Sequence, residues 1–394
     1  MASEQSDQLT DGTIIGNRFK VVQKLGEGGC GSVFKVEDQQ DKNKLCALKV
    51  EFSNGSVPDS ILKMEVQILE ALKPKKHMVK LIASAKRPEF SYMVMTLLGE
   101  SLMGLVDKHG PFLNVSTQTR IAIMLLFGIK QIHDIGYIHR DLKPANIALG
   151  YKGTEEERFF MILDFGLARQ YVSKTEGGKL ALRRPRDRAL FRGTSRYCSI
   201  AMHDRTEQGR VDDLWALTYM FAELRCKLPW AETYEKDDIA ILKRETLDDQ
   251  LFKNSPVQFL EFVKEVRKLN YYDRPDYEKL YKILNGIMKE ANYKWSDPYH
   301  WELQGKKGRK SRDNSTDTTC SNEPRKPKNK KKFSFSERFL KSSRNRKSPA
   351  KKTEGGSTRS SRTKTKALTI SPSGTASDPP VLTNDDFTSN PIGF

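Results

Sequence analysis

The chain has 394 residues, a formal net charge of +18 and five cysteines. This length allows a two-lobed enzyme or two ordinary domains, with a core large enough to need neither disulfides nor metals. The cysteines at positions 30, 46, 198, 226 and 320 have no paired spacing and an odd total, which argues against a disulfide framework or a zinc site. We expect a soluble, cytoplasmic protein, because the polar stretch Met1–Thr10 cannot act as a signal peptide and no apolar run is long enough to cross a bilayer.

The positive charge is concentrated towards the C-terminus. Residues 305–366 contain 22 Lys or Arg against 5 Asp or Glu, and residues 367–394 contain three Asp and no base. Residues 1–304 are therefore almost balanced, at +4. Because a basic stretch with few apolar residues cannot bury enough surface to fold, we predict a disordered lead at 1–15, a folded domain at 16–303 and a disordered tail at 304–394.

The predicted elements divide the folded domain into two lobes. Short runs with strand composition come first, at 18–25, 32–37, 45–51, 79–85 and 91–97, and a helical pattern at 58–72 separates the third from the fourth. Later apolar residues recur near every 3.6 positions, at 116–136, 211–227, 256–269 and 277–291. This order predicts an α+β fold with a β-rich N-lobe at about 16–97, a hinge at 96–99, a mainly helical C-lobe at about 100–303, and a cleft between the lobes.

A glycine-rich turn joins the first two predicted strands. It reads Gly26, Glu27, Gly28, Gly29, Cys30, Gly31, Ser32, Val33. Glycines let backbone N–H groups approach a phosphate closely. A plain hairpin can carry the same residues, and so can a dinucleotide-binding loop, but the latter opens onto a helix, whereas this turn leads into a strand.

One lysine, Lys49, lies inside the otherwise apolar strand Cys46–Val50. A buried ammonium group is costly unless it meets anions, so we predict that Lys49 binds phosphates and pairs with Glu65 of the first helix. The alternative is that Lys49 lies on an edge strand and extends its charge into solvent.

The most specific motif is HRDLKPAN, from His139 to Asn146. In this loop Asp141 can accept the proton of an acceptor hydroxyl, Lys143 can offset charge on a transferred phosphoryl group, and Asn146 can bind Mg²⁺. A second metal ligand, Asp164, follows in the tripeptide Asp-Phe-Gly at 164–166.

These motifs, in this order and spacing, resemble those of the eukaryotic protein kinases over residues 16–303. The segments LDFGLARQY at 163–171, FRGT at 191–194, GTSRYCSIAMH at 193–203, GRVDDLW at 209–215 and LPW at 228–230 are similar to the casein kinase I group, and within it to the tau-tubulin kinase branch. The resemblance implies a monomeric serine/threonine protein kinase that uses ATP and Mg²⁺ and acts on protein substrates.

The resemblance also implies roles for further residues. The nucleotide would lie against the glycine-rich turn and against Val33, Ala47, Met95 and Leu98, with Met95 guarding the back of the adenine pocket. Thr194 would contact Asp141 and favour serine and threonine acceptors, and Asp213 would brace the backbone of the HRD turn. Met95 is equally consistent with plain core, and Asp213 with a carboxylate that stabilises the start of a helix.

A basic cluster lies just before Thr194. Arg186, Arg188 and Arg192 fall where relatives in that group hold an anion-binding patch, so we expect a preference for acidic or already phosphorylated substrates. The alternative is a solvated group of charges.

The basic tail leaves its partner open. Residues 324–332 have the composition of a nuclear import signal, a phosphate-binding patch or a solubilising run, and residues 332–341 interleave aromatics, bases and serines as switches at anionic membranes do. Tubulin tails and nucleic acid are further candidates, although a nucleic-acid-binding protein would rest on tail charge alone. The competing class is a pseudokinase or scaffold that docks through this tail. Pseudokinases usually lack the catalytic lysine or one of the two aspartates, so the presence of Lys49, Asp141 and Asp164 argues against it.

Overall fold

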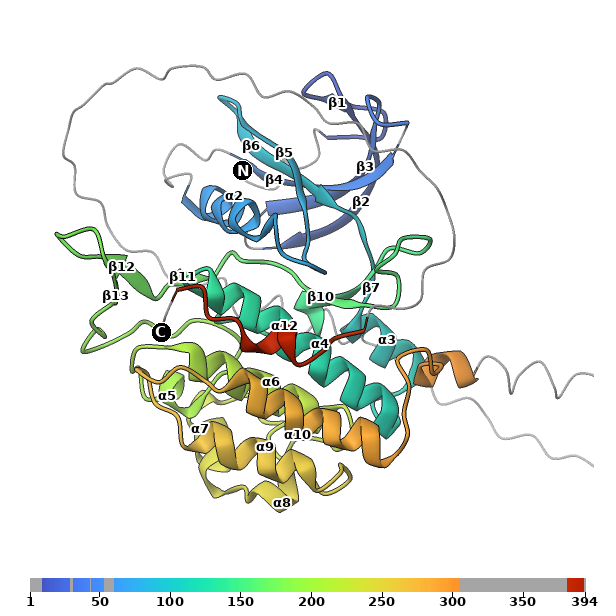
Figure 1. Ribbon diagram of the computed structural model, residues 1–394. Helices are drawn as coiled ribbons and strands as arrows, with labels where there is room; N and C mark the ends of the chain where they lie inside the picture. The colour runs from blue at the N-terminus through green and yellow to red at the C-terminus, as the bar shows by residue number, and fades with distance from the viewer. Residues whose placement is uncertain (1–8, 29–30, 43, 53–59, 305–380, 393–394) are drawn as a thin grey trace, which may run out of the picture. The chain divides into compact units, whose positions relative to one another are not determined.

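The N-terminal part of the chain forms one curled antiparallel sheet beside a single helix. The computed structural model describes residues 9–28, 31–42, 44–52, 60–304 and 381–392. Six strands pair in the order β1-β2-β3-β4-β6-β5, with helix α2 beside them (Figure 1). Their bounds are β1 Ile14–Ile15, β2 Phe19–Gly28, β3 Gly31–Asp38, β4 Lys44–Phe52, β5 Leu81–Lys86, β6 Phe90–Thr96 and α2 Ser60–Leu72.

Alternation of side chains explains how this sheet packs. In β3 the residues at every second position are buried, from Ser32 to Asp38, and they meet the apolar side of β2 and β4. The central strand β4 is paired on both sides, with β3 and with β6, so Lys49 does not lie on an edge. The structure thereby removes the edge-strand alternative for this lysine.

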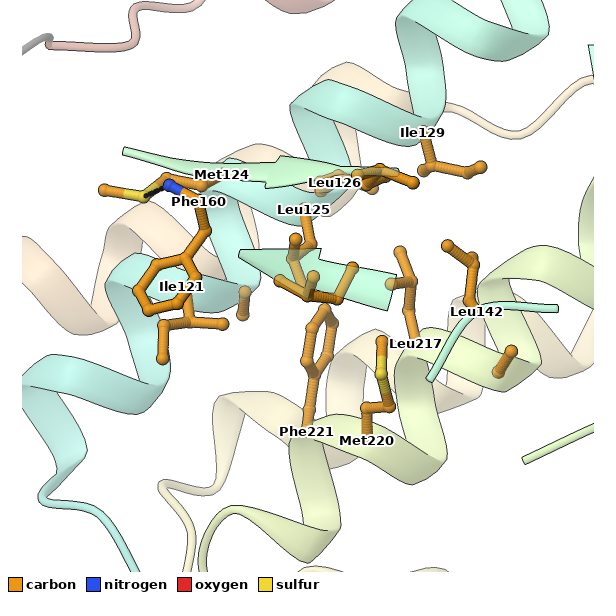
Figure 2. Close-up of a cluster of buried hydrophobic side chains, with 14 of the residues drawn as sticks. Ile121, Met124, Leu125, Leu126, Ile129, Leu142, Phe160, Leu217, Met220 and Phe221 are labelled. Carbon is orange, nitrogen blue, oxygen red and sulfur yellow. Dashed lines mark hydrogen bonds between the residues drawn. The ribbon is translucent and has the colours of Figure 1, made fainter. Parts of the chain in front are cut away.

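The C-lobe is mainly helical, and all four of its predicted helices are present. Its helices are α3 Leu102–His109, α4 Val115–Asp134, α5 Ile200–His203, α6 Arg210–Glu223, α7 Lys236–Glu245, α8 Asp248–Leu251, α9 Gln258–Arg267 and α10 Tyr277–Glu290. The central helix α4 begins at the cap Asn114, whose side chain accepts a hydrogen bond from the Thr117 N–H at 2.8 Å. Nearly all of α4 is buried, and Figure 2 shows its apolar side chains meeting those of α6, such as Leu217 and Phe221.

The short strands of the C-lobe were missed by the sequence analysis. They are β7 Leu98–Ser101, β8 Tyr137–Ile138, β9 Ile147–Gly150, β10 Phe160–Ile162, β11 Arg169–Gln170, β12 Val172–Lys174 and β13 Leu180–Leu182. They pair as β10-β9-β7, β11-β8 and β12-β13. A one-turn helix, η1 Pro144–Asn146, leads from the HRD loop into β9. These small sheets hold the two ends of that loop in place.

The C-terminal end of the chain corrects one prediction. Disorder was predicted for all of 304–394, but residues 381–392 pack on the C-lobe, include the short helix α12 Asp385–Thr388, and bury Leu382 and Phe387. In Figure 1 this segment is red and crosses α4. Of the predicted tail, 305–380 lies outside the described residues, and so does 1–8 of the lead predicted at 1–15. The rest of that lead corrects the prediction, because Ile14 and Ile15 pair with β2 and Ile15 is buried. Within the described ranges, no helix is both long and apolar enough to cross a membrane.

Candidate active site

One buried carboxylate binds the backbone at the start of the HRD loop. Asp213, in the first turn of α6, accepts hydrogen bonds from the backbone N–H groups of His139 and Arg140, at 2.7 and 2.8 Å. Its carboxylate also lies 2.9 Å from Nε2 of His133. Burial opposes ionisation here, but the hydrogen bond and charge of His133, together with His139 and the Arg140 N–H, outweigh it and lower the pKa of Asp213. Asp213 therefore fixes a turn in which Arg140 adopts a φ of 68°.

Asp141 lies at the centre of a group of polar side chains. Its Oδ1 accepts a hydrogen bond from the Thr194 hydroxyl at 2.8 Å, and its Oδ2 accepts one from the Lys143 ammonium at 2.6 Å. The Asn146 amide donates to the Asp141 carbonyl oxygen at 2.9 Å. Four residues that the sequence singled out are thus brought together. Since a carboxylate offers about four lone-pair positions and two are used here, the Asp141 carboxylate keeps capacity for about two more donors.

The approach of Thr194 depends on a glycine. Gly193 has a φ of 88°, and a Cβ at this position would lie 2.4 Å from the Arg140 carbonyl oxygen. Any other residue would push the two backbones apart. Gly193 thus allows the Thr194 hydroxyl to reach Asp141.

A second charged group joins the two lobes. The Lys49 ammonium on β4 donates to both carboxylate oxygens of Glu65 on α2, at 2.6 and 2.9 Å, and to Oδ1 of Asp164 at 3.0 Å. Burial disfavours the charge on Lys49, but the two carboxylates outweigh it and raise the pKa of Lys49. Lys49 in turn lowers the pKa of Asp164 against the effect of burial. Lys49 and Asp164 are therefore charged at neutral pH, whereas burial raises the pKa of Glu65 to about 7.

Most of the residues expected to face a nucleotide lie on N-lobe strands, and one, Leu98, begins the first short strand of the C-lobe. Ala47 and Met95 are cross-strand neighbours on β4 and β6, Val33 pairs with Gly26, and Leu98 begins β7. Gly31 has a φ of 114°, and a Cβ there would lie 2.0 Å from the Val50 carbonyl oxygen, so glycine is required. Gly28 pairs with Gly31 at the tip, and the Glu27 carboxylate accepts from Lys24 at 3.0 Å. Gly29 and Cys30 lie outside the described residues.

The predicted anion patch is only partly available. The guanidinium of Arg186 is held by both carboxylate oxygens of the buried Glu207, at 2.9 Å for one of them. Arg169 approaches the same carboxylate at 3.6 Å. Arg188 and Arg192 are exposed. Sequence reasoning found the arginines and missed Glu207, which lies 21 positions from Arg186 and has no distinguishing local pattern.

Two more charged residues that position the segment after Thr194 were also missed. Lys243 on α7 is 3% exposed and donates to the carbonyl oxygens of Ser195 and Cys198 at 2.7 and 2.5 Å. Glu223 at the end of α6 accepts from Arg196 at 2.7 Å and from the Tyr197 hydroxyl at 2.5 Å. For Glu223 the available signal was a charged residue within an apolar helical stripe, whereas Lys243 lies in a mostly polar segment that gave no such signal.

The arrangement suits Mg²⁺ bound together with a nucleotide. Magnesium prefers oxygen ligands and usually takes only one or two protein side chains, with phosphate and water completing its octahedron. The Asp164 carboxylate and the Asn146 amide are ligands of this kind. No cluster of three or more His, Cys, Asp or Glu able to hold a metal by itself occurs in the described part of the chain.

Comparison with known proteins places this site in a family. Residues 19–283 match the family model of the protein kinase domain. A Caenorhabditis elegans protein named "Putative serine/threonine-protein kinase K06H7.1" is 62% identical over 308 residues, covering 78% of this chain and 88% of that protein. The chain belongs to the protein kinase family, in its serine/threonine class.

More distant relatives lie in the group that the motifs indicated. Casein kinase I homolog 3 of Schizosaccharomyces pombe is 30% identical over 300 residues, covering 74% of this chain and 66% of that protein. A Caenorhabditis elegans protein named "Inactive tau-tubulin kinase ttbk-6" is 33% identical over 249 residues, covering 61% of this chain and 86% of that protein. The resemblance to casein kinase I and tau-tubulin kinases is thereby confirmed.

Proposed function

We propose that this chain transfers the γ-phosphate of ATP to serine and threonine hydroxyls of protein substrates. The observation that carries this proposal is the position of Asp141, which is oriented by Thr194 and Lys143 beside the Lys49–Glu65–Asp164 group. An enzyme of this kind acts mainly by positioning and by electrostatic stabilisation.

Each residue has a distinct part in the proposed transfer. Asp141 orients the acceptor hydroxyl and takes its proton as the new oxygen–phosphorus bond forms and the bond to the leaving diphosphate breaks. Lys143 offsets negative charge on the transferred group, and Lys49 holds the phosphates that remain with the nucleotide. Asn146 and Asp164 would hold Mg²⁺, which supplies charge neutralisation between the phosphates.

The test is phosphate transfer from Mg-ATP to casein by the full chain, beside Asp141→Asn. We expect Asp141→Asn to lose at least a hundredfold in kcat while still binding nucleotide, because the proton acceptor is removed and Lys49 is untouched. Asp107→Asn, an exposed position on α3, is the matched control and should keep full activity. Nucleotide binding without transfer by the unchanged chain would contradict the proposal and favour the scaffold alternative.

We further propose that the kinase prefers acidic or already phosphorylated substrates. Arg188 and Arg192 are exposed near Thr194, whereas Arg186 is held by Glu207, so the preference should depend on the first two. Arg188→Ala with Arg192→Ala should reduce the rate ratio between a phosphorylated peptide and its unphosphorylated twin several-fold. Arg184→Ala, also exposed, is the control. Equal rates on the two peptides with the unchanged chain would refute the preference.

The basic stretch 305–366 lies outside the described residues, and its partner is proposed from charge alone. Its 22 Lys and Arg are expected to bind a polyanion such as tubulin tails, an anionic membrane or nucleic acid, with an affinity that falls as salt rises. Co-sedimentation with microtubules, vesicles and RNA, with and without residues 305–366, distinguishes these partners. We predict a cytoplasmic location. If residues 324–332 act as a nuclear import signal, the protein would also enter the nucleus.

A further inference from the structure

The C-terminal end of the chain forms a compact turn through its own residues. In the segment 381–392, here called the C-terminal anchor, the backbone N–H and the hydroxyl of Thr383 both donate to the Asp386 carboxylate, at 2.9 and 3.1 Å. This is the Thr-x-x-acid pattern that starts a helix, and α12 follows it. The turn places Leu382 and Phe387 on the side that packs against the domain, and both are buried.

The apolar contacts of the anchor are made with two helices of the C-lobe. The Phe387 ring stacks on Tyr281 of α10, with centroids 4.2 Å apart and planes inclined by 10°. Its edge meets Phe127 of α4 at 5.9 Å. The Tyr281 hydroxyl donates to the Leu382 carbonyl oxygen at 3.0 Å. The ring of Phe387 is thus held on two sides, and a smaller side chain would leave the pocket unfilled.

Polar contacts fix the direction of the anchor on this surface. The Lys130 ammonium, itself paired with Asp134, donates to the Ser389 hydroxyl at 2.8 Å. Arg274 donates to the Ser389 carbonyl oxygen at 3.1 Å, and the Asn384 amide donates to Glu278 at 3.0 Å.

Charge also favours the anchor at this place. It carries Asp385 and Asp386, and the Asp386 carboxylate lies 4.0 Å from the Lys76 ammonium. An acidic segment therefore meets a basic surface.

The pocket and its occupant come from different parts of the chain. Phe127, Lys130, Arg274 and Tyr281 all lie within residues 19–283, the part that matches the kinase family. The anchor lies beyond that part, after the 76 residues from 305 to 380. A segment so distant along the chain, with its own local turn and two buried side chains, has the composition of a docking peptide rather than of a domain element.

We propose that the surface of α4 and α10 around Tyr281 is a docking site for a short acidic peptide with a Leu-x₄-Phe-x-Ser pattern, and that its occupant is the chain's own C-terminal anchor. Docking in this way holds the far end of the basic stretch on the C-lobe. Since Gln304 already lies on the C-lobe, through a hydrogen bond to the His109 carbonyl oxygen at 3.1 Å, both ends of the 76 residues are tied to the same lobe. This proposal does not depend on the catalytic activity.

The test is binding in trans of a fluorescent peptide spanning residues 379–394. The receptor is the full chain carrying Leu382→Ala and Phe387→Ala, which vacates the pocket without altering its walls. We expect saturable binding to this variant, and at least tenfold weaker binding to the unchanged chain, whose pocket is filled by its own anchor. No saturable binding to the variant, or equal binding to both chains, would overturn the proposal.

Changes in the peptide test the pattern without any effect on the folding of the receptor. The peptide with Phe387→Ala should bind at least tenfold more weakly, whereas the peptide with Val381→Ala should bind unchanged because Val381 is 58% exposed. Equal affinities for these two peptides would refute recognition through Phe387. Analytical sedimentation of the unchanged chain gives the last check. If the chain is a dimer and Phe387→Ala turns it into a monomer, the anchor comes from a second copy. The proposal of docking within one chain would then be refuted.

Discussion

At the scale of single residues, the orientation of Asp141 depends on side chains from distant parts of the chain. Lys143 is its near neighbour in sequence, but Thr194 approaches from 53 positions away and Asp213 supports the turn from below. The HRDLKPAN motif predicted Lys143 from its chemistry, whereas Thr194 and Asp213 followed from the family resemblance, which left a helix-stabilising carboxylate open as the alternative for Asp213. Glu207 could not be predicted, since a carboxylate that pairs with Arg186 is defined only by the path of the chain in space.

Thr194→Val tests the contribution of the hydroxyl that donates to Asp141. Valine keeps the shape and removes the donor, and a hydrogen bond to a charged group contributes about 1.5–3 kcal/mol. We therefore expect kcat to fall about 10- to 100-fold with little change in the free energy of unfolding, measured by phosphate transfer and urea denaturation. Thr194→Ser retains the donor and should restore most of the rate. A serine variant as slow as the valine variant would show that the hydroxyl alone does not sustain the rate.

Asp213→Asn tests the support beneath the HRD turn. The amide can present its oxygen to only part of the set formed by two backbone N–H groups and His133, so a buried donor is left without an acceptor. We expect a loss of about 3 kcal/mol in the free energy of unfolding, read from urea curves, together with a fall in kcat. The exposed Asp107→Asn serves again as the comparison. An unchanged free energy of unfolding would mean that the HRD turn is stable without the Asp213 carboxylate.

At the scale of elements, helix α7 holds in place the segment that follows Thr194. Lys243 directs its ammonium to two carbonyl oxygens of that segment and lies over the rings of Tyr219 and Trp230, at 4.8 and 5.5 Å from their centroids. Burial lowers the pKa of Lys243 to about 8. The helix was not predicted, because its ten residues are mostly polar and carry too few apolar positions for a clear period.

The pH dependence of stability tests this burial. Between pH 8 and the ordinary value of 10.5, an unfolded lysine keeps its proton while the folded Lys243 releases it, so stability rises with pH across this window. We expect the free energy of unfolding of the unchanged chain, relative to Lys243→Met, to rise by about 2 kcal/mol from pH 8 to pH 10. Urea denaturation at several pH values measures it. A difference that stays flat would show that the ammonium is solvated.

Length and pairing decide which elements could be predicted. The long helices α4, α6, α9 and α10 and the strands β2 to β6 carry several turns or pleats of one pattern, and their predicted bounds agree with the structure to within a few residues. The strands β8 to β13 have two to four residues each, and their partners lie elsewhere in the chain. Two residues cannot show a period, so such strands become visible only after the chain has folded.

At the scale of the whole molecule, the folded part of the chain extends beyond the region that carries the kinase motifs. The family match ends at 283, whereas residues 293–304 return to the N-terminal half of α4. Arg120 of that helix donates to the carbonyl oxygens of Trp295, Asp297 and Pro298, at 3.2, 2.6 and 3.2 Å. The predicted domain boundary at 303, drawn where the composition turns basic and polar, falls at the end of this packed stretch.

Tyr299 is the residue on which this last stretch depends most. It is 2% exposed, its ring stacks on Trp301 at 4.7 Å and meets the edge of Phe160 at 6.0 Å, and the guanidinium of Arg120 lies 4.3 Å from its centroid. Tyr299→Ala leaves a cavity against β10 and deprives that guanidinium of an aromatic face.

We expect Tyr299→Ala to lower the free energy of unfolding by about 3–5 kcal/mol in urea denaturation, as for other buried aromatic truncations. Leu190→Ala, at a position 69% exposed, should cost less than about 0.5 kcal/mol and serves as the control. A loss below about 1 kcal/mol for Tyr299→Ala would mean that residues 293–304 only cover the domain. A loss in the expected range would place the end of the cooperative unit at 304, twenty-one residues beyond the family match, and so make this stretch part of the catalytic domain.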